Sequence, residues 1–215
     1  MRPVSRPNKT SPDATTLPVE SLEQAADAAR ACTLCAAHLP LGPRPVFRLS
    51  PTARLLIVGQ APGTKVHETG IPWNDASGDR LRDWLALDHE VFYDASRIAI
   101  MPMGLCYPGR AASGGDNPPR PECAPTWHAR LRAVMPAIRL TLLVGSYAQA
   151  HYLGKARKPT MTETVAAWRD HAPDFIPTPH PSWRTTGWQR RNPWFEAEVV
   201  PALRERVRAL VGEVR

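Results

Sequence analysis

The stretch RLLIVGQAPG, residues 54–63, decides which fold we expect for this chain. Its first half is a short, continuous apolar run, which is typical of a strand buried on both faces of a parallel sheet. Its second half is a turn rich in glycine and proline that ends the run. Sites in open parallel sheets lie beyond the carboxyl ends of the strands, so we expect the turn at 59–63 to belong to a site.

Three further apolar runs follow along the chain, and helical patterns separate them. The runs are RIAIM (97–101), LTLLVG (140–145) and FIPT (175–178). Apolar residues at helical spacing occupy 19–31, 78–87, 124–135, 147–153, 160–169 and 193–211. We expect Ser146 to cap the helix at 147–153, and Thr160 to form a capping box with Glu163. This alternation predicts an α/β fold, a three-layer α/β/α sandwich around a central, mainly parallel four-stranded sheet.

The chain of 215 residues fits one α/β domain better than two. We expect a disordered leader at 1–18 and a single domain at 19–215. No apolar run reaches the roughly 18–20 residues that span a bilayer, and the leader lacks the apolar core of a secretory signal. The default expectations are therefore a cytoplasmic location, no membrane partner and a monomer.

The chain is basic, with a net charge of +7 and a pI of about 9.7. Such a surface favours a polyanionic partner such as a nucleic acid. Solubility alone is the alternative explanation, so the placement of the arginines matters more than their number.

Four loops follow the predicted strands, namely GQAPG (59–63), MPMGLC (101–106), GSYAQ (145–149) and TPHPS (178–182). Because the carboxyl ends of parallel strands meet at one edge of a sheet, we expect these loops to converge on one cleft.

The four cysteines are Cys32, Cys35, Cys106 and Cys123. The first two form a CxxC, and the other two flank a stretch rich in proline and glycine. Disulfides are disfavoured in the cytoplasm, and a redox CxxC would leave the second pair unexplained. Four thiolates suit a metal centre, for which we favour a [4Fe–4S] cluster over zinc because zinc usually recruits two close pairs. Four unrelated buried thiols are the remaining alternative.

Several of these motifs, taken in order, match one known family. GQAPG (59–63), TGIPWNDASGD (69–79), the four-cysteine pattern and HPS (180–182) resemble the iron–sulfur uracil-DNA glycosylases, families four and five of their superfamily. The resemblance covers about residues 30–210. It implies a monofunctional DNA-repair glycosylase that removes uracil from single- or double-stranded DNA, leaves an abasic site, and carries a [4Fe–4S] cluster on the four cysteines.

Cleavage of an N-glycosidic bond develops positive charge on the sugar and negative charge on the departing base. A carboxylate and a hydrogen-bond donor are therefore the groups required. The resemblance implies that Asp75 is the carboxylate and that His180 donates to O2 of uracil as a neutral imidazole. Trp73 stands where the family has a phenylalanine and would stack on the extruded base. Asp79 is the competing carboxylate, and a capping or pairing role in the following helix is its alternative.

The substrate-binding residues that the resemblance implies are Gly59, Gln60, Ala61, Pro62, Gly63, Trp73, Asn74, Gly104 and Ser182. Two positions depart from the family pattern. Gln60 stands where family four has a glutamate, and an amide cannot act as a base. Pro102 stands near the place of an asparagine that reads the uracil edge. That role would fall to backbone groups of Met103 or Gly104, or to Asn74, and hypoxanthine, xanthine and mismatched bases stay candidate substrates.

The segment SWRTTGWQRRNPW (182–194) mixes arginines with tryptophans directly after the histidine motif. Arginines hold phosphates, and an inserted aromatic ring can fill the space that a flipped base leaves. Burial against neighbouring helices is the alternative for the tryptophans. The DNA-binding candidates are Trp183, Arg184, Trp188, Arg190 and Arg191.

Two other functions compete with the glycosylase. One is a non-catalytic iron–sulfur protein that binds nucleic acid on the same fold, because fold does not fix function. The other is a nucleotide-binding enzyme that uses GQAPG as a phosphate loop. The second ranks low, because the loop lacks the lysine of a P-loop.

Overall fold

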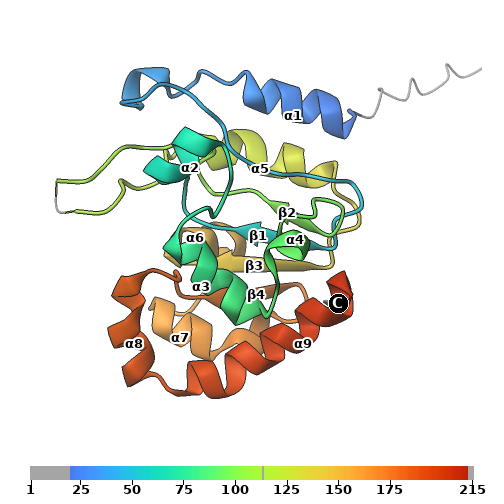
Figure 1. The fold of residues 1–215 in the computed structure, drawn as a ribbon, viewed down its shortest axis with the longest axis vertical. Helices are drawn as coiled ribbons and strands as arrows, with labels where there is room; N and C mark the ends of the chain where they lie inside the picture. The colour runs from blue at the N-terminus through green and yellow to red at the C-terminus, as the bar shows by residue number, and fades with distance from the viewer. Residues whose placement is uncertain (1–19, 113, 213–215) are drawn as a thin grey trace, which may run out of the picture.

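The computed structural model describes residues 20–112 and 114–212 (Figure 1). Four parallel strands form one sheet in the order β2-β1-β3-β4. The strands are β1 (Leu55–Val58), β2 (Ile98–Ile100), β3 (Leu140–Val144) and β4 (Phe175–Thr178). Every strand residue is buried except Phe175, as the apolar runs predict. The α/β prediction is confirmed, and the sheet is wholly rather than mainly parallel.

Helices cover both faces of this sheet (Figure 1). They are α1 (Leu22–Arg30), α2 (Thr64–Thr69), α3 (Ala76–Leu85), α4 (His89–Phe92), α5 (Cys123–Ala133), α6 (Ser146–Leu153), α7 (Met161–Ala166), α8 (Thr186–Arg191) and α9 (Val200–Val211). Helices α3, α7 and α9 pack on the face that carries Leu55, Ile57 and Leu142. Helices α5 and α6 pack on the face of Leu56 and Val58, with α1 lying against α5. Alternate residues of one strand thus enter two separate cores.

Two predictions about helix ends are wrong. Ser146 is the first residue of α6 rather than its cap, and Gly145 precedes it with no side-chain cap. The helix predicted at 193–211 is divided, because a π-helical turn at Phe195–Val199 leads into α9. Pro201 lies at the start of α9, where it has no amide hydrogen to continue an α-helical ladder. The capping box of Thr160 and Glu163 is present at α7.

The parallel register brings the loops after the strands to one edge of the sheet. Ile57 is aligned with Ile100 on one side and with Leu142 on the other. Leu143 is in turn aligned with Pro177 of β4. The expected disordered leader at 1–18 lies outside the described residues. Among the residues described, no helix has the length and apolar character needed to cross a bilayer.

Candidate active site

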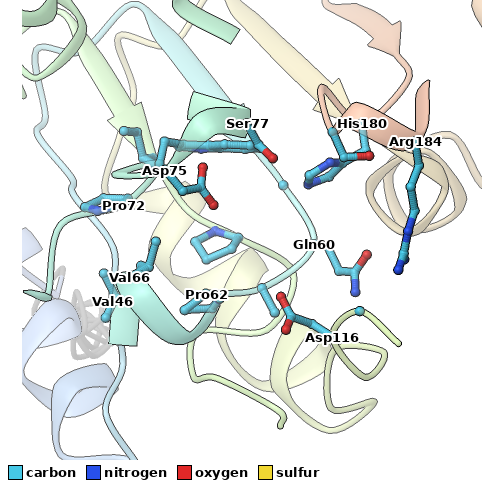
Figure 2. A pocket seen from close by; sticks show the side chains of 18 of the residues that line it. Val46, Gln60, Pro62, Val66, Pro72, Asp75, Ser77, Asp116, His180 and Arg184 are labelled. Carbon is cyan, nitrogen blue, oxygen red and sulfur yellow. The ribbon is translucent and has the colours of Figure 1, made fainter. Parts of the chain in front are cut away.

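The loops after the strands enclose a cavity of about 440 Å³ (Figure 2). The cavity brings together most of the residues that the sequence singled out. These are Gly59, Gln60, Ala61, Pro62, Gly63, Trp73, Asp75, His180, Ser182, Trp183 and Arg184. They come from the segments after β1 and β4 and from the turn before α3. Of the four loops expected to converge, those after β1, β2 and β4 line the cavity, with Pro102 as the residue from the loop after β2, whereas the loop at 145–149 contributes no lining residue.

Trp73 forms one wall of the cavity in a restricted backbone conformation. Its φ of 57° is left-handed, which is uncommon for a large side chain. Its indole lies against the ring of His180, with centroids 5.6 Å apart. Gly59 makes room for it, because a Cβ there would come within 2.7 Å of the indole. The hydroxyl of Tyr93 donates to the carbonyl of Pro72 at 2.8 Å, which holds the turn that contains Trp73 in place. These contacts hold the indole ring in one position on the cavity wall.

Gly78 is required by the same turn, and its substitution gives a first test. A Cβ at Gly78 would lie 1.7 Å from the carbonyl oxygen of Trp73. We expect Gly78→Ala to lower the free energy of unfolding by about 1–3 kcal/mol, as overpacking does in well-packed interiors. Gly187→Ala is the matched control, because its nearest contact would be an ordinary 3.8 Å from Arg191. Urea unfolding measures both. Equal stability of the two variants would contradict this packing.

Asp75 has two roles in the geometry. One carboxylate oxygen, Oδ1, accepts the amide hydrogen of Gly78 at 2.9 Å and so caps α3. The side chain also lines the cavity (Figure 2). The cap holds the carboxylate in place, because it ties the side chain to the first turn of a rigid helix. Asp79 instead pairs with Arg82 at 2.6 Å with its side chain 75% exposed, so it does not compete for the cavity.

His180 follows β4 and faces Asp75 across the cavity (Figure 2). Burial lowers the pKa of His180, and the charge of Asp75 opposes this only in part. The imidazole is therefore neutral at neutral pH, which is the form expected for a histidine that donates a hydrogen bond without carrying charge. The hydroxyl of Thr185 donates to the carbonyl of His180. Arg80 of α3 donates to the carbonyl of Ser182 at 2.9 Å, which ties the helix of Asp75 to the segment after His180.

Five candidate residues lie outside this cavity. Asn74 donates to the hydroxyl of Thr69 at 3.5 Å, and Gly104 lines a second cavity among the cysteines. The indole of Trp188 donates to Thr162 at 2.7 Å and packs against Trp194. Arg190 and Arg191 are exposed on α8 and do not line the cavity. The first part of the segment 182–194 thus reaches the site, and its second part covers α7.

The cavity also contains polar residues that the sequence did not reveal. Ser77, Arg110 and Asp116 line it beside the predicted set. Burial raises the pKa of Asp116, and the charge of Arg110 opposes this shift. Both residues lie between the third and fourth cysteines, where the family motifs give no signal. An isolated antiparallel bridge between them closes the loop that holds Asp116 against the cavity.

All four cysteines line the second cavity, together with Gly104 and Trp127. Two N–H groups point at the sulfurs, since the indole of Trp127 lies 3.3 Å from Cys32 Sγ and the amide of Leu105 lies 3.2 Å from Cys123 Sγ. Burial raises the pKa of Cys106 to about 11 and that of Cys123 to about 12. No group of three or more His, Cys, Asp or Glu side chains in the described segments is arranged to hold a metal ion.

A family model and a solved structure are similar to this chain. The family model of the uracil DNA glycosylase superfamily matches residues 47–204. Among solved structures, a solution NMR structure of a candidate uracil DNA glycosylase from Methanosarcina acetivorans is similar, with 17% sequence identity and a TM-score of 0.40. That match covers 74% of this chain and 93% of the other.

Proposed function

The chain belongs to the uracil DNA glycosylase superfamily, and we propose that it is a monofunctional DNA-repair enzyme that hydrolyses the N-glycosidic bond of uracil in DNA. One observation carries this proposal. A helix-capping carboxylate, Asp75, and a half-buried neutral imidazole, His180, line one cavity beside the indole of Trp73. These are the three groups that cleavage of an extruded nucleotide requires.

Each residue has a separate task in this reaction. The base lies on the indole of Trp73. Asp75 stabilises the positive charge that develops on the sugar and orients the attacking water. His180 donates a hydrogen bond to O2 of uracil as the base leaves with negative charge, and its neutral form avoids a competing proton transfer. The described residues that line the cavity include no lysine for a lyase step, so the product is an intact abasic strand.

DNA would approach the cavity across Trp183 and Arg184. Trp183 is 79% exposed, which is unusual for so large an apolar ring. The guanidinium of Arg184 lies 5.5 Å from the centre of that ring. An exposed ring can fill the gap left by an extruded base, and the adjacent cation can hold a phosphate. Single-stranded DNA is also a substrate, because extrusion from it costs less than from a duplex.

The phosphate contact gives a second test. We expect Arg184→Gln to weaken binding of an abasic-site oligonucleotide and to reduce the slope of log affinity against log salt by about one unit. Arg208→Gln is the control, because Arg208 is exposed on α9 and does not line the cavity. Fluorescence anisotropy at several salt concentrations measures both slopes. Identical slopes in the two variants would remove Arg184 from the DNA contact.

We propose that the four cysteines hold a [4Fe–4S] cluster. All four sulfurs line one cavity, as a shared metal centre requires. The N–H groups of Trp127 and Leu105 point at two of the sulfurs, as hydrogen bonds that stabilise cluster thiolates do. Cys32, Cys35, Cys106 and Cys123 would hold the cluster, which would serve a structural purpose by joining the segment after α1 to α5.

Release of free uracil tests the proposed function. Protein purified without oxygen is incubated with a uracil-containing oligonucleotide, and the supernatant is separated by chromatography. We expect free uracil in amounts that match the abasic sites formed, with the strand intact until alkali is added. Binding without any release of base would instead support a non-catalytic nucleic-acid-binding protein on this fold.

A further inference from the structure

The backbone of Trp73 has a conformation that a large side chain rarely adopts. Among the described residues, Ala86 is the other non-glycine residue with a positive φ, at 52°. Ala86 ends α3, and a left-handed residue is a common end for a helix. Trp73 lies in a turn and ends no helix, so its φ of 57° has no such explanation. Strained residues of this kind persist where the surrounding structure holds them in place.

Two side chains from outside the cavity hold the backbone of this turn. The hydroxyl of Tyr93 donates to the carbonyl of Pro72 at 2.8 Å. Arg82 Nη1 donates to the carbonyl of Trp73 at 3.4 Å and to the hydroxyl of Tyr93 at 3.3 Å. The two carbonyls belong to the peptide groups on either side of the Trp73 Cα. Because peptide groups are planar, fixing both of them fixes the φ and ψ of Trp73.

Arg82 and Tyr93 are themselves held in place. The Arg82 side chain is only 12% exposed, and its guanidinium lies 5.7 Å from the centre of the Tyr93 ring. The guanidinium of Arg48 lies 5.0 Å from the same ring and donates to the carbonyl of Tyr93 at 3.0 Å. The backbone of Arg48 exchanges two hydrogen bonds with Ile100 of the edge strand β2. A continuous set of contacts therefore joins the edge of the sheet to the turn of Trp73.

The hydroxyl of Tyr93 is able to donate at neutral pH. Burial raises the pKa of Tyr93, and the positive charge of Arg82 opposes this shift. The hydroxyl therefore keeps its proton, donates it to Pro72, and accepts the hydrogen of Arg82. Replacing either side chain removes a bond from the backbone of the turn without removing a group from the cavity, because neither Arg82 nor Tyr93 lines it.

We propose that Tyr93 and Arg82 are positioning residues that fix the backbone of Trp73 and so set where an extruded base lies relative to Asp75 and His180. This inference rests on the proposed function, but the contact itself can be tested without catalysis. Misplacement of reacting groups by about 1 Å can cost about 10²-fold in rate. Contacts to phosphates lie elsewhere, so binding of DNA should depend little on this pair.

Tyr93→Phe tests the proposal by removing a single oxygen atom. We expect the maximal single-turnover rate of uracil release to fall at least about tenfold, while the enzyme concentration that gives half of this rate changes less than about twofold. Tyr107→Phe is the matched control. Its ring is buried, its hydroxyl lies 3.1 Å from that of Thr64, and it does not line the cavity. This variant should keep both quantities close to those of the wild type.

Variants of Arg82 test whether the two residues act as one unit. Arg82→Met should lower the maximal rate about as much as Tyr93→Phe does, and Arg82→Lys, which keeps a donor, should restore part of it. The double variant should be no slower than the slower single variant, because residues in one network are not additive. Thermal unfolding confirms that each protein is folded. Additive losses, or an unchanged rate in folded Tyr93→Phe, overturn the proposal.

The position of Trp73 is followed directly by 19F NMR of protein labelled with 5-fluorotryptophan. The chain has seven tryptophans, and the signal that is missing from Trp73→Phe belongs to Trp73. We expect this signal to shift or broaden in Tyr93→Phe and to stay unchanged in Tyr107→Phe. Base release by the wild type with an unmoved Trp73 signal in Tyr93→Phe refutes this inference alone. A Trp73 signal that moves as expected, without base release by the wild type, refutes the proposed function alone.

Discussion

Replacement of Asp75 by asparagine is expected to lower the single-turnover rate of uracil release by about 10²–10⁴-fold, the range that a positioned acid–base group contributes. The amide has the shape of the carboxylate but neither its charge nor its basicity. Asparagine is as good a helix cap as aspartate, so the bond to Gly78 and the start of α3 should persist. Rapid-quench assays with enzyme in excess measure the rate, and anisotropy should show DNA binding close to that of the wild type.

Asp79→Asn is the matched control for this prediction. Asp79 lies one helical turn further along α3, is largely exposed, and pairs with Arg82. We expect this variant to keep a rate within a fewfold of the wild type, because exposed ion pairs contribute roughly 0–1 kcal/mol. An active Asp75→Asn protein together with an inactive Asp79→Asn protein would contradict this prediction. Asp79, and not Asp75, would then be the catalytic carboxylate.

Replacement of Cys123 by serine should have the largest effect on stability. This sulfur is buried, accepts a hydrogen bond from Leu105, and lies in the cavity that the other three cysteines share. If the four sulfurs hold a cluster, loss of one ligand should lower the free energy of unfolding by more than about 4 kcal/mol, as loss of a structural metal site does. An iron–sulfur cluster gives a broad absorbance near 400 nm, and this absorbance should disappear at the same time.

Ala124→Ser is the control for this variant, since it adds a hydroxyl at the adjacent buried position without removing a sulfur. It should keep the absorbance and most of the stability. Metal analysis of the wild type should give about four irons per chain, as a cubane cluster requires. One zinc per chain, or no metal together with a stable Cys123→Ser protein, would contradict the cluster.

The sheet could be predicted from sequence because each strand is a continuous apolar run buried on both faces. The loops at 59–63 and 178–182 followed from the same reasoning, since register places them at one edge. Short helices escaped prediction, as α2 and α4 have only six and four residues and no apolar period to detect. The π-helical turn before α9 depends on packing around Phe195, which a periodic pattern cannot show.

The site was predictable where a motif marks it and hidden where only tertiary contacts do. Asp75 and His180 stand in short motifs, and the fold brings them to one cavity. Asp116 stands in a glycine-rich loop whose position depends on Asn117 and on a bond from Gln60. Trp188 has the composition of a DNA contact, but its bond to Thr162 turns it toward α7. Such contacts are made only after the chain has folded.

The measurement that tests the glycosylase assignment most directly compares two oligonucleotides that differ by a single base, uracil or thymine. Each is incubated with protein purified without oxygen and then treated with alkali, which cuts the strand at abasic sites. We expect a single cut at the uracil position, no cut in the thymine strand, and loss of the cut in Asp75→Asn. An uncut uracil strand from folded wild-type protein, or equal cutting by Asp75→Asn, would contradict the assignment.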